Sequence, residues 1–299
     1  MRALVFGSLN IDYVYQVEHF VQRGETLASS SFQRFSGGKG LNQAIALSRA
    51  GVDTCMAGAV GEEGTFLLEE LRRAGVDTRY VEHSPIPTGH AIIQNTPDGD
   101  NCILLYGGAN RSIRPEQAAA VIGQFTPGDL LLVQNEISSL LPIMRLGKEK
   151  GMRVALNPSP MEEARIREVL PFADTLLLNR IEASQLLGSE EAEPEKLLRE
   201  LQERFGCKEI VLTLGGEGAV LLREERIFRQ AAFPVKAVDS TGAGDTFTGF
   251  FLAAVLQEKD EAFALRFAAA AAALSVTRKG ASPSIPTWEE VLLFLKEKK

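Results

Sequence analysis

Cysteine, histidine and tryptophan are scarce in this 299-residue sequence, which has three cysteines, three histidines and one tryptophan. The cysteines, Cys55, Cys102 and Cys207, lie far apart, and no CxxC pair or Cys/His spacing typical of a metal site occurs. This pattern predicts buried, reduced thiols rather than disulfides or a zinc centre. The histidines are equally scattered, so we expect no catalytic triad built on histidine.

Long apolar runs are also missing. The most apolar late stretch, AFALRFAAAAAALSV, is too short to span a membrane and contains Arg266. The first residues, MRALVFGSLN, hold one basic residue and a very short apolar run, which is typical of a first strand rather than a signal peptide. We therefore expect a cytoplasmic protein without a membrane partner.

Positive charge is in deficit, with 32 Lys and Arg against 39 Asp and Glu and a net charge of -7. The excess of negative charge disfavours non-specific binding to nucleic acid or to an anionic membrane. It does not exclude a small anionic ligand, because local backbone dipoles decide such binding. The hydrophobic content of 45% is ordinary for a globular protein, and the length fits two domains or one large domain with an addition.

Short apolar segments alternate with helix-like ones along most of the chain. Segments such as ALVF, LLLV and IVLT lack polar alternation, which is typical of strands buried on both faces. The alternation predicts an α/β fold with a mainly parallel sheet and helices on both faces. Residues 13–35 and 86–106 instead favour a small antiparallel sheet outside the main one, or extra edge strands of a single sheet.

The stretch DSTGAGDTFTGFF, residues 239–251, places Asp245 between a small-residue loop and an apolar helix. Gly242, Ala243 and Gly244 can turn sharply and expose backbone N–H groups, and the helix N-terminus adds partial positive charge. Such a site stabilises a phosphate. A carboxylate beside it could remove the proton from an alcohol that attacks phosphorus, or could simply cap the helix.

A second glycine-rich stretch, FSGGKGLNQAIALSRAG, occupies residues 35–51 before another predicted helix. It is not a Walker A loop, because Lys39 is followed by glycine rather than by serine or threonine. Glycines such as Gly38 would let the backbone approach a ligand closely, and Lys39 and Asn42 could donate to hydroxyl groups. A tight turn before a helix is the alternative interpretation.

Polar side chains also follow other predicted strands. Asn10 and Asp12 come after the first strand, where Asp12 could accept two hydroxyls of a polyol, or where both could serve turn chemistry. Asn179 and Glu182 are either an N-cap with its capping-box partner or contacts to phosphate and to hydrated Mg²⁺.

The stretch VLTLGGEGAVLL predicts a strand, a glycine turn and a second strand. Thr213, Gly215 and Gly218 could hold the phosphates and ribose of a nucleotide, or could form an ordinary hairpin turn. In an open parallel sheet, ligands bind at the carboxyl ends of the strands, so we expect these loops to converge there.

Together, GGKGLNQA and DSTGAGDTFTGFF resemble the N-terminal and C-terminal signatures of the ribokinase-like (phosphofructokinase B type) family of carbohydrate kinases. The resemblance extends from VFGSLNID to VTRKGASPSIP, which is essentially the whole chain. It implies a large α/β domain of residues 1–12, 36–85 and 107–299, and a β-sheet lid of residues 13–35 and 86–106. It further implies a homodimer that is joined through the lids.

The resemblance implies ATP-dependent phosphorylation of D-ribose at its 5-hydroxyl, with Mg²⁺ and an activating K⁺. The alternatives are a kinase for deoxyribose, fructose, adenosine or pseudouridine, or a non-catalytic sensor of sugar or nucleotide. A sensor would tolerate loss of the base, whereas Asp245 stands here in an intact glycine loop.

The resemblance also implies roles for individual residues. Asp245 would be the catalytic base, and the anion hole would consist of Gly242, Ala243 and Gly244. The sugar would be held by Asn10, Asp12, Gly38, Lys39, Asn42, Glu136 and Asp245. ATP would be held by Asn179, Thr213, Gly215 and Gly218, with Glu182 bound to Mg²⁺ through water. K⁺ would be held, mostly through carbonyl oxygens, by Asp239, Thr241, Ser275, Arg278, Gly280 and Ser284. Ala269 departs from the family pattern, because a histidine is expected there beside adenine.

Overall fold

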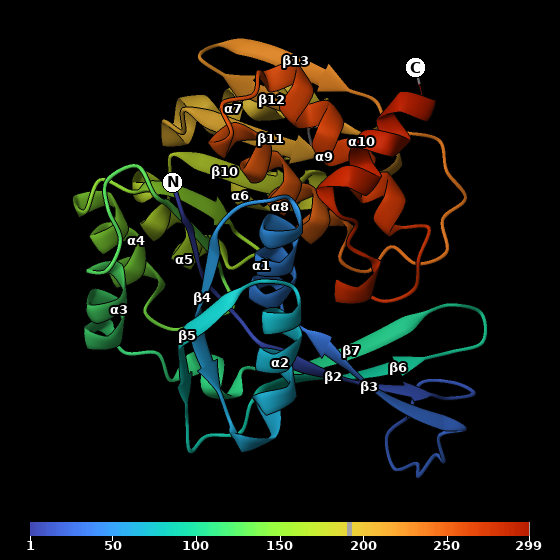
Figure 1. Cartoon of the computed structure of the whole chain (residues 1–299). Helices are drawn as coiled ribbons and strands as arrows, with labels where there is room; N and C mark the ends of the chain where they lie inside the picture. The colour runs from blue at the N-terminus through green and yellow to red at the C-terminus, as the bar shows by residue number, and fades with distance from the viewer. Residues whose placement is uncertain (190–192, 299) are drawn as a thin grey trace.

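The computed structural model describes residues 1–189 and 193–298, and within them nine strands form one large sheet (Figure 1). In spatial order the strands are β13 (Arg226–Gln230), β12 (Ala219–Arg223), β11 (Glu209–Thr213), β10 (Thr175–Asn179), β9 (Arg153–Asn157), β8 (Leu130–Gln134), β1 (Ala3–Phe6), β4 (Thr54–Val60) and β5 (Asp77–His83). Only β12 pairs antiparallel with its neighbours. The prediction of a mainly parallel sheet is therefore confirmed.

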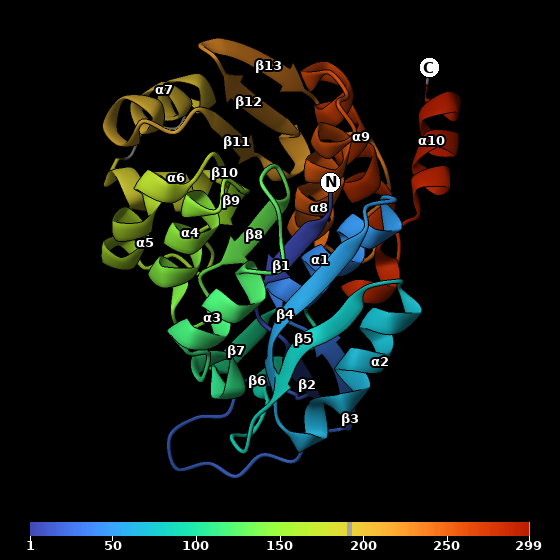
Figure 2. The same ribbon diagram turned by 60° about the vertical axis from the view of Figure 1, so that its left-hand side comes forward.

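Helices cover both faces of this sheet (Figure 2). One face is covered by α1 (Lys39–Arg49), α2 (Thr65–Arg73), α8 (Ala243–Leu256), α9 (Glu261–Ser275) and α10 (Trp288–Glu297). The other face is covered by α3 (Pro115–Ile122), α4 (Leu140–Glu149), α5 (Glu163–Val169), α6 (Arg180–Leu187) and α7 (Pro194–Phe205). None of the helices in the described residues has the length and apolarity needed to cross a membrane.

The two helical layers explain why the strands have no polar alternation. In β1, Ala3 and Val5 pack with the first layer, whereas Leu4 and Phe6 pack with the second. Both faces of the strand are therefore buried, and each position needs an apolar side chain.

A second sheet of four strands projects from the large one (Figure 1). Its order is β3 (Ser31–Gly37), β2 (Asn10–Gln16), β6 (Gly89–Asn95) and β7 (Asn101–Tyr106). The outer pairs are antiparallel as expected, but the prediction of a wholly antiparallel sheet is wrong, because β2 and β6 are parallel. The reason is that β2 follows β1 and β6 follows β5, and these two strands run in the same direction in the large sheet. The residue boundaries expected for a separate lid domain stay a prediction.

The cysteines differ in their burial. Cys55 and Cys207 are buried, and burial raises the pKa of each thiol to about 11, so both stay protonated at neutral pH. Cys102 is exposed, so the expectation of three buried thiols is wrong there. Its strand, β7, forms an edge of the small sheet, and all of its residues are exposed.

Helices α1 and α8 pack very closely against each other. A methyl group at Gly249 of α8 would lie 2.4 Å from Cβ of Ala46 and 2.9 Å from the backbone nitrogen of Leu47, both on α1. Glycine therefore allows an approach that a larger residue would prevent. The contact brings the first turns of the two helices side by side.

We expect Gly249→Ala to lower the free energy of unfolding by about 1–3 kcal/mol, the usual cost of overpacking a dense core. The measurement is urea unfolding followed by circular dichroism. Gly123→Ala is a suitable control, because Gly123 has right-handed helical backbone angles and its nearest neighbour lies at 3.2 Å. Equal stability of the Gly249 variant and the wild type would contradict the close packing.

Candidate active site

Asp245 lies in the first turn of α8 and is buried. Its Oδ2 accepts a hydrogen bond from Nδ2 of Asn42 at 3.0 Å, and its Oδ1 accepts one from Nε2 of Gln43 at 2.8 Å. Both donors belong to α1. The carboxylate is thus bonded to a neighbouring helix rather than to the N-terminal amides of its own, which argues against a simple capping role.

The glycine loop before Asp245 has the sharp turn that its sequence predicts. Gly242 has a φ of 74°, and a side chain there would begin 3.1 Å from Ala281. A side chain at Gly244 would instead meet open space. The N–H of Ala243 donates to the carbonyl of Ser240 at 3.2 Å, so this member of the expected anion hole is already paired. The amide of Gly244 lies in the first helical turn, where N–H groups lack an intrahelical acceptor.

A small cavity of about 140 Å³ adjoins Asp245 and Gly244. Its polar lining includes Lys39, Asn157, Ser159, Asn179, Glu182 and Thr213. These residues follow β9, β10 and β11 or begin α1 and α6. The expected convergence of loops at the carboxyl ends of the parallel strands is therefore present.

Lys39 provides positive charge inside this cavity. Burial alone would lower the pKa of its ammonium group. The negative charges of Asp245, Glu136 and Glu182 outweigh that effect, so the pKa lies above its ordinary value. Lys39 is therefore protonated at every pH at which the protein is expected to work.

Asp12 and Glu136 are two acidic residues whose charges interact. Burial, with a smaller effect of the charge on Glu136, raises the pKa of Asp12 to about 6. Oε2 of Glu136 accepts hydrogen bonds from the hydroxyl of Ser8 and, at 3.2 Å, from the backbone N–H of Lys39. A side chain at Gly37 would begin 2.3 Å from the Asp12 carboxylate, so glycine is needed for this arrangement.

Asn10 and Asn42 complete the residues expected to hold a sugar. Asn10 is buried, and its Oδ1 accepts a hydrogen bond from Nδ2 of Asn110 at 2.7 Å. Asn42 has a buried Oδ1 that has no partner among the described residues, so it can accept a hydrogen bond from a hydroxyl group. Gly38, with a φ of 96°, lies so close to Ser8 and Asn10 that a side chain would begin 2.8–2.9 Å from their backbones.

A larger and mostly apolar cavity of about 450 Å³ adjoins the first. The two cavities share Thr213 and Gly244, and the larger one is also lined by Gly215, Gly216, Phe233, Phe247 and Ala269. Side chains at Gly215 and Gly216 would meet open space, so glycine leaves this room for a ligand. At Gly218 glycine is needed for the fold itself, since a side chain would begin 2.0 Å from the carbonyl oxygen of Gln230. The 213–218 segment is therefore both a hairpin turn and a cavity wall.

Asn179 and Glu182 form the capping box that the sequence suggests. Oδ1 of Asn179 accepts from the N–H of Glu182 at 2.9 Å, and Oε2 of Glu182 accepts from the N–H of Asn179 at 3.0 Å. Both residues also line the smaller cavity. The two interpretations offered by the sequence are thus compatible.

Asp239 lies just outside the glycine loop, where it accepts three hydrogen bonds. Its donors are the N–H of Thr241 at 2.9 Å, the hydroxyl of Thr241 at 2.7 Å and the N–H of Gly280 at 2.9 Å. Burial alone would raise the pKa of Asp239, but these donors hold it below its usual range. Hydrogen bonds therefore join the loop around 239–241 to residues 276–280, with the charged carboxylate of Asp239 between the two segments.

Other residues expected around K⁺ use their side chains elsewhere. The hydroxyls of Ser275 and Ser284 donate to the carbonyls of Ala272 and Ala281, and Arg278 pairs with Glu290 at 2.5 Å. They could reach an ion through backbone carbonyls or hydroxyl lone pairs only. Within the described residues no cluster of three or more His, Cys, Asp or Glu side chains could hold a metal.

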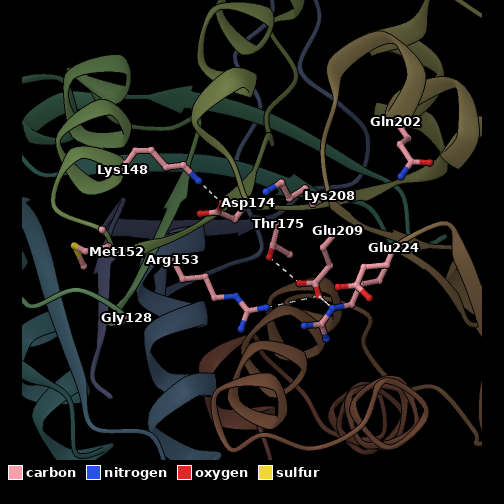
Figure 3. Close-up of a pocket in the computed structure, with 12 residues that line it drawn as sticks. Gly128, Lys148, Met152, Arg153, Asp174, Thr175, Gln202, Lys208, Glu209 and Glu224 are labelled. Carbon is pink, nitrogen blue, oxygen red and sulfur yellow. Dashed lines mark hydrogen bonds and ion pairs between the residues drawn. The ribbon is translucent and has the colours of Figure 1, made fainter.

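The largest of the three cavities, about 550 Å³, shares no lining residue with the other two. Figure 3 shows the residues that line it. It surrounds the amino ends of β9, β10 and β11, at the opposite edge of the sheet. Its charged groups mostly pair with one another, as Lys148 does with Asp174 and Arg153 does with Glu209. Its size is therefore no argument for chemistry there.

A buried carboxylate beside a glycine-rich turn, with two adjoining cavities at the carboxyl ends of parallel strands, is an arrangement suited to phosphoryl transfer. Residues 2–288 match the pfkB family of carbohydrate kinases, and the chain belongs to this family. The match covers nearly the whole chain, so it includes both sheets and every loop around Asp245.

Relatives within the family have more specific names. The chain is 36% identical to the ribokinase of Haemophilus influenzae over 298 residues, which is 97% of each chain. It is 30% identical to the deoxyribokinase of Salmonella typhi over 303 residues, which is 99% of each chain. The structure of Arabidopsis thaliana ribokinase complexed with ribose and ATP is similar, with a TM-score of 0.88, 33% identity, and coverage of 99% of this chain and 98% of that one.

The raised pKa of Asp12 predicts how the affinity for a sugar depends on pH. The ionised carboxylate offers both of its oxygens as acceptors to two hydroxyls, whereas protonation turns one of them into a donor. We therefore expect KM for the sugar to rise as pH falls below about 6. In Asp12→Asn, KM should be high and independent of pH over this range. A wild-type KM that stays constant between pH 7 and pH 5 would place Asp12 outside the site.

The same shift predicts an opposite effect of Asp12 on stability. The pKa is higher in the folded state than in the unfolded chain, so ionisation of Asp12 destabilises the fold as pH rises from about 4 to about 6. Asp12→Asn should therefore unfold no more easily than the wild type at pH 7. Thermal unfolding at pH 7 checks that the kinetic effect is not a loss of fold.

Proposed function

We propose that this chain catalyses the ATP-dependent phosphorylation of D-ribose at its 5-hydroxyl. The observation that carries the proposal is the position of Asp245, with the residues suited to a polyol on one side and two adjoining cavities on the other. The identity to ribokinases supports ribose in particular.

In the proposed reaction Asp245 acts as the general base. It accepts the proton of the 5-hydroxyl while the oxygen attacks the γ-phosphorus of ATP in line. A new O–P bond forms, the bond between phosphorus and the β–γ bridging oxygen breaks, and ADP leaves. The amides at the start of α8, with the helix dipole and Lys39, stabilise the charge on the transferred phosphoryl oxygens.

Sugar and nucleotide would bind on opposite sides of Gly244. Asp12, Asn10 and Asn42 would hold the hydroxyls of the sugar, with Glu136 and Gly38 close to the same end. The apolar cavity beside Gly215 and Ala269 would take adenine, where alanine leaves room but supplies no hydrogen bond.

Mg²⁺ fits the smaller cavity. The Glu182 carboxylate lines the cavity and uses Oε2 for its capping box, which suits a hydrated ion that keeps most of its waters. Bound Mg²⁺ would neutralise charge on the phosphates of ATP. Asn179 and Thr213 would lie beside the phosphates.

K⁺ fits the loop around Asp239, because that carboxylate stays charged and is surrounded by backbone turns. The carbonyls of Thr241, Ser275, Arg278, Gly280 and Ser284 would supply the other oxygens. Since the same loop continues into Gly242, a cation there would stabilise the turn that forms the anion hole.

A deoxyribose kinase is the second candidate, because a deoxyribokinase is 30% identical over the same length. The two sugars differ by one hydroxyl, so the choice depends on contacts such as those of Asp12 and Asn42. The higher identity to ribokinases favours ribose.

The small sheet carries an apolar surface that suits a homodimer. Ile103, Leu104, Leu105 and Tyr106 on β7 are 47–68% exposed, and Phe32 on β3 is 52% exposed. An uncovered edge strand of this kind is prone to pair with another chain. We propose that two copies of the chain form a dimer in which each covers the apolar surface of the other. We also propose that the enzyme works in the cytoplasm, where ATP is available.

We expect Asp245→Asn to reduce kcat by at least about 10²-fold while binding of ATP and ribose persists, because only the base is lost. The assay is ADP release with ribose, deoxyribose, fructose, adenosine or pseudouridine, in K⁺ or in Na⁺. Ribose should give the highest kcat/KM, and K⁺ should increase it. Near-normal turnover of the variant would exclude Asp245 as the base, and preference for another sugar would exclude ribose.

We expect the wild type to sediment as a dimer and Leu104→Lys to sediment as a monomer, because the charge would be buried in the interface. Leu293→Lys is the matched control, since Leu293 is 59% exposed on α10. A monomeric wild type at micromolar concentration, measured by analytical ultracentrifugation, would contradict the proposed dimer.

A further inference from the structure

Two buried glutamines form a chain of hydrogen bonds that ends at Asp245. Gln134 is the last residue of β8, and Gln43 lies in α1; neither side chain is exposed to solvent. Nε2 of Gln134 donates to Oε1 of Gln43 at 2.7 Å, and Nε2 of Gln43 donates to Oδ1 of Asp245 at 2.8 Å. The sequence motifs drew attention to neither residue.

The direction of these two hydrogen bonds follows from the charge on Asp245. An ionised carboxylate only accepts hydrogen bonds, so Gln43 must present its NH₂ group to Asp245. Its carbonyl oxygen then faces Gln134, which must donate in turn. The order Gln134, Gln43, Asp245 thus fixes the orientation of both amides.

Core stability does not account for the two amides. A buried amide costs free energy unless all its groups are paired, and Oε1 of Gln134 has no partner within the described part of the chain. That oxygen also restricts its surroundings, because a side chain at Gly7 would begin 2.2 Å from it. Apolar side chains of similar size at positions 43 and 134 would avoid the cost of the unpaired oxygen.

The hydrogen bonds fix the rotation of the Asp245 carboxylate about its terminal side-chain bond. The carboxylate of an aspartate rotates about its terminal bond with weak preference. Here Asn42 holds one oxygen at 3.0 Å and Gln43 holds the other at 2.8 Å, so the plane of the carboxylate is fixed from α1. Gln134 acts only through Gln43, which it keeps from rotating its amide.

We propose that Gln43 and Gln134 are positioning residues for the general base. They hold Asp245 in the orientation that accepts the substrate proton. The proposal rests on the role of Asp245 given above. The charged side chains that share the cavity with Asp245 are Lys39 on α1 and Glu182 on α6, and neither touches the two glutamines through a hydrogen bond in the described residues.

The first test is Gln43→Met, which keeps the size and removes the donor. We expect kcat to fall about 10- to 100-fold, the effect of losing one hydrogen bond to a charged group. KM for ribose and for ATP should change less than about threefold, because Gln43 lies behind the base.

Gln134→Met tests whether the second glutamine acts through the first. Alone it should lower kcat by a smaller factor, about 3- to 10-fold, because the amide of Gln43 remains but is free to rotate. In the Gln43→Met background it should cause no further loss. Additive losses of kcat in the double variant would show that the two residues act separately. That result would overturn the proposal that Gln134 acts through Gln43.

Gln117→Met is the matched control, because Gln117 on α3 is also a buried glutamine, with a single long contact of 3.5 Å to the carbonyl of Gly58. It should leave kcat unchanged. Equal losses of kcat at positions 43 and 117, or a Gln43 variant with normal kcat, would refute the proposal. If the glutamine variants give a refuting result while Asp245→Asn is inactive, only the role of the glutamines is refuted. If Asp245→Asn is active, the proposed role of Asp245 as the base is refuted.

Discussion

The close contact between α1 and α8 determines the geometry of the whole site. Gly249 lets the two helices approach until Ala46 lies against it, and one turn earlier Asn42 and Gln43 reach Asp245. One helix therefore supplies the carboxylate and the other supplies the groups that orient it. A larger residue at position 249 would separate the two helices, so a packing constraint in the core determines how Asp245 is oriented.

The order of strands places the remaining groups around this pair. β1 lies between β8 and β4, and the chain continues from β1 into the small sheet with Asn10 and Asp12. Glu136 follows β8, which is the neighbour of β1 in the large sheet. Polar residues that are far apart in sequence thus meet where neighbouring strands end, as is typical of open parallel sheets. The small sheet extends from the point where Asp12 and Gly37 are in contact.

Much of this arrangement can be predicted from the sequence. Unbroken apolar strands predict the parallel sheet, and the glycine stretches predict the loops around Asp245, Lys39 and Gly215. Pairing within the small sheet could not be predicted, because the parallel arrangement of β2 and β6 depends on the directions of β1 and β5 rather than on local composition. Cys102 was misjudged for a similar reason, since an uncovered edge strand has the same residue pattern as a covered one.

The glutamines and Asn110 show a second limit. A glutamine in a helix is more often exposed than buried, so nothing in the local pattern distinguishes Gln43 from a surface residue. Only the packing of α1 between the sheet and α8 shows that its amide must find a partner. Asn110 likewise becomes informative only when the fold brings it to Leu9 and Asn10.

We expect this enzyme to transfer the γ-phosphoryl group of ATP to the 5-hydroxyl of ribose and to no other hydroxyl. The most direct measurement is ¹³C and ³¹P NMR of the product formed from ATP and uniformly ¹³C-labelled ribose. We expect one phosphate resonance coupled to C5. Coupling to C1, or no transfer to ribose by the folded enzyme, would contradict it.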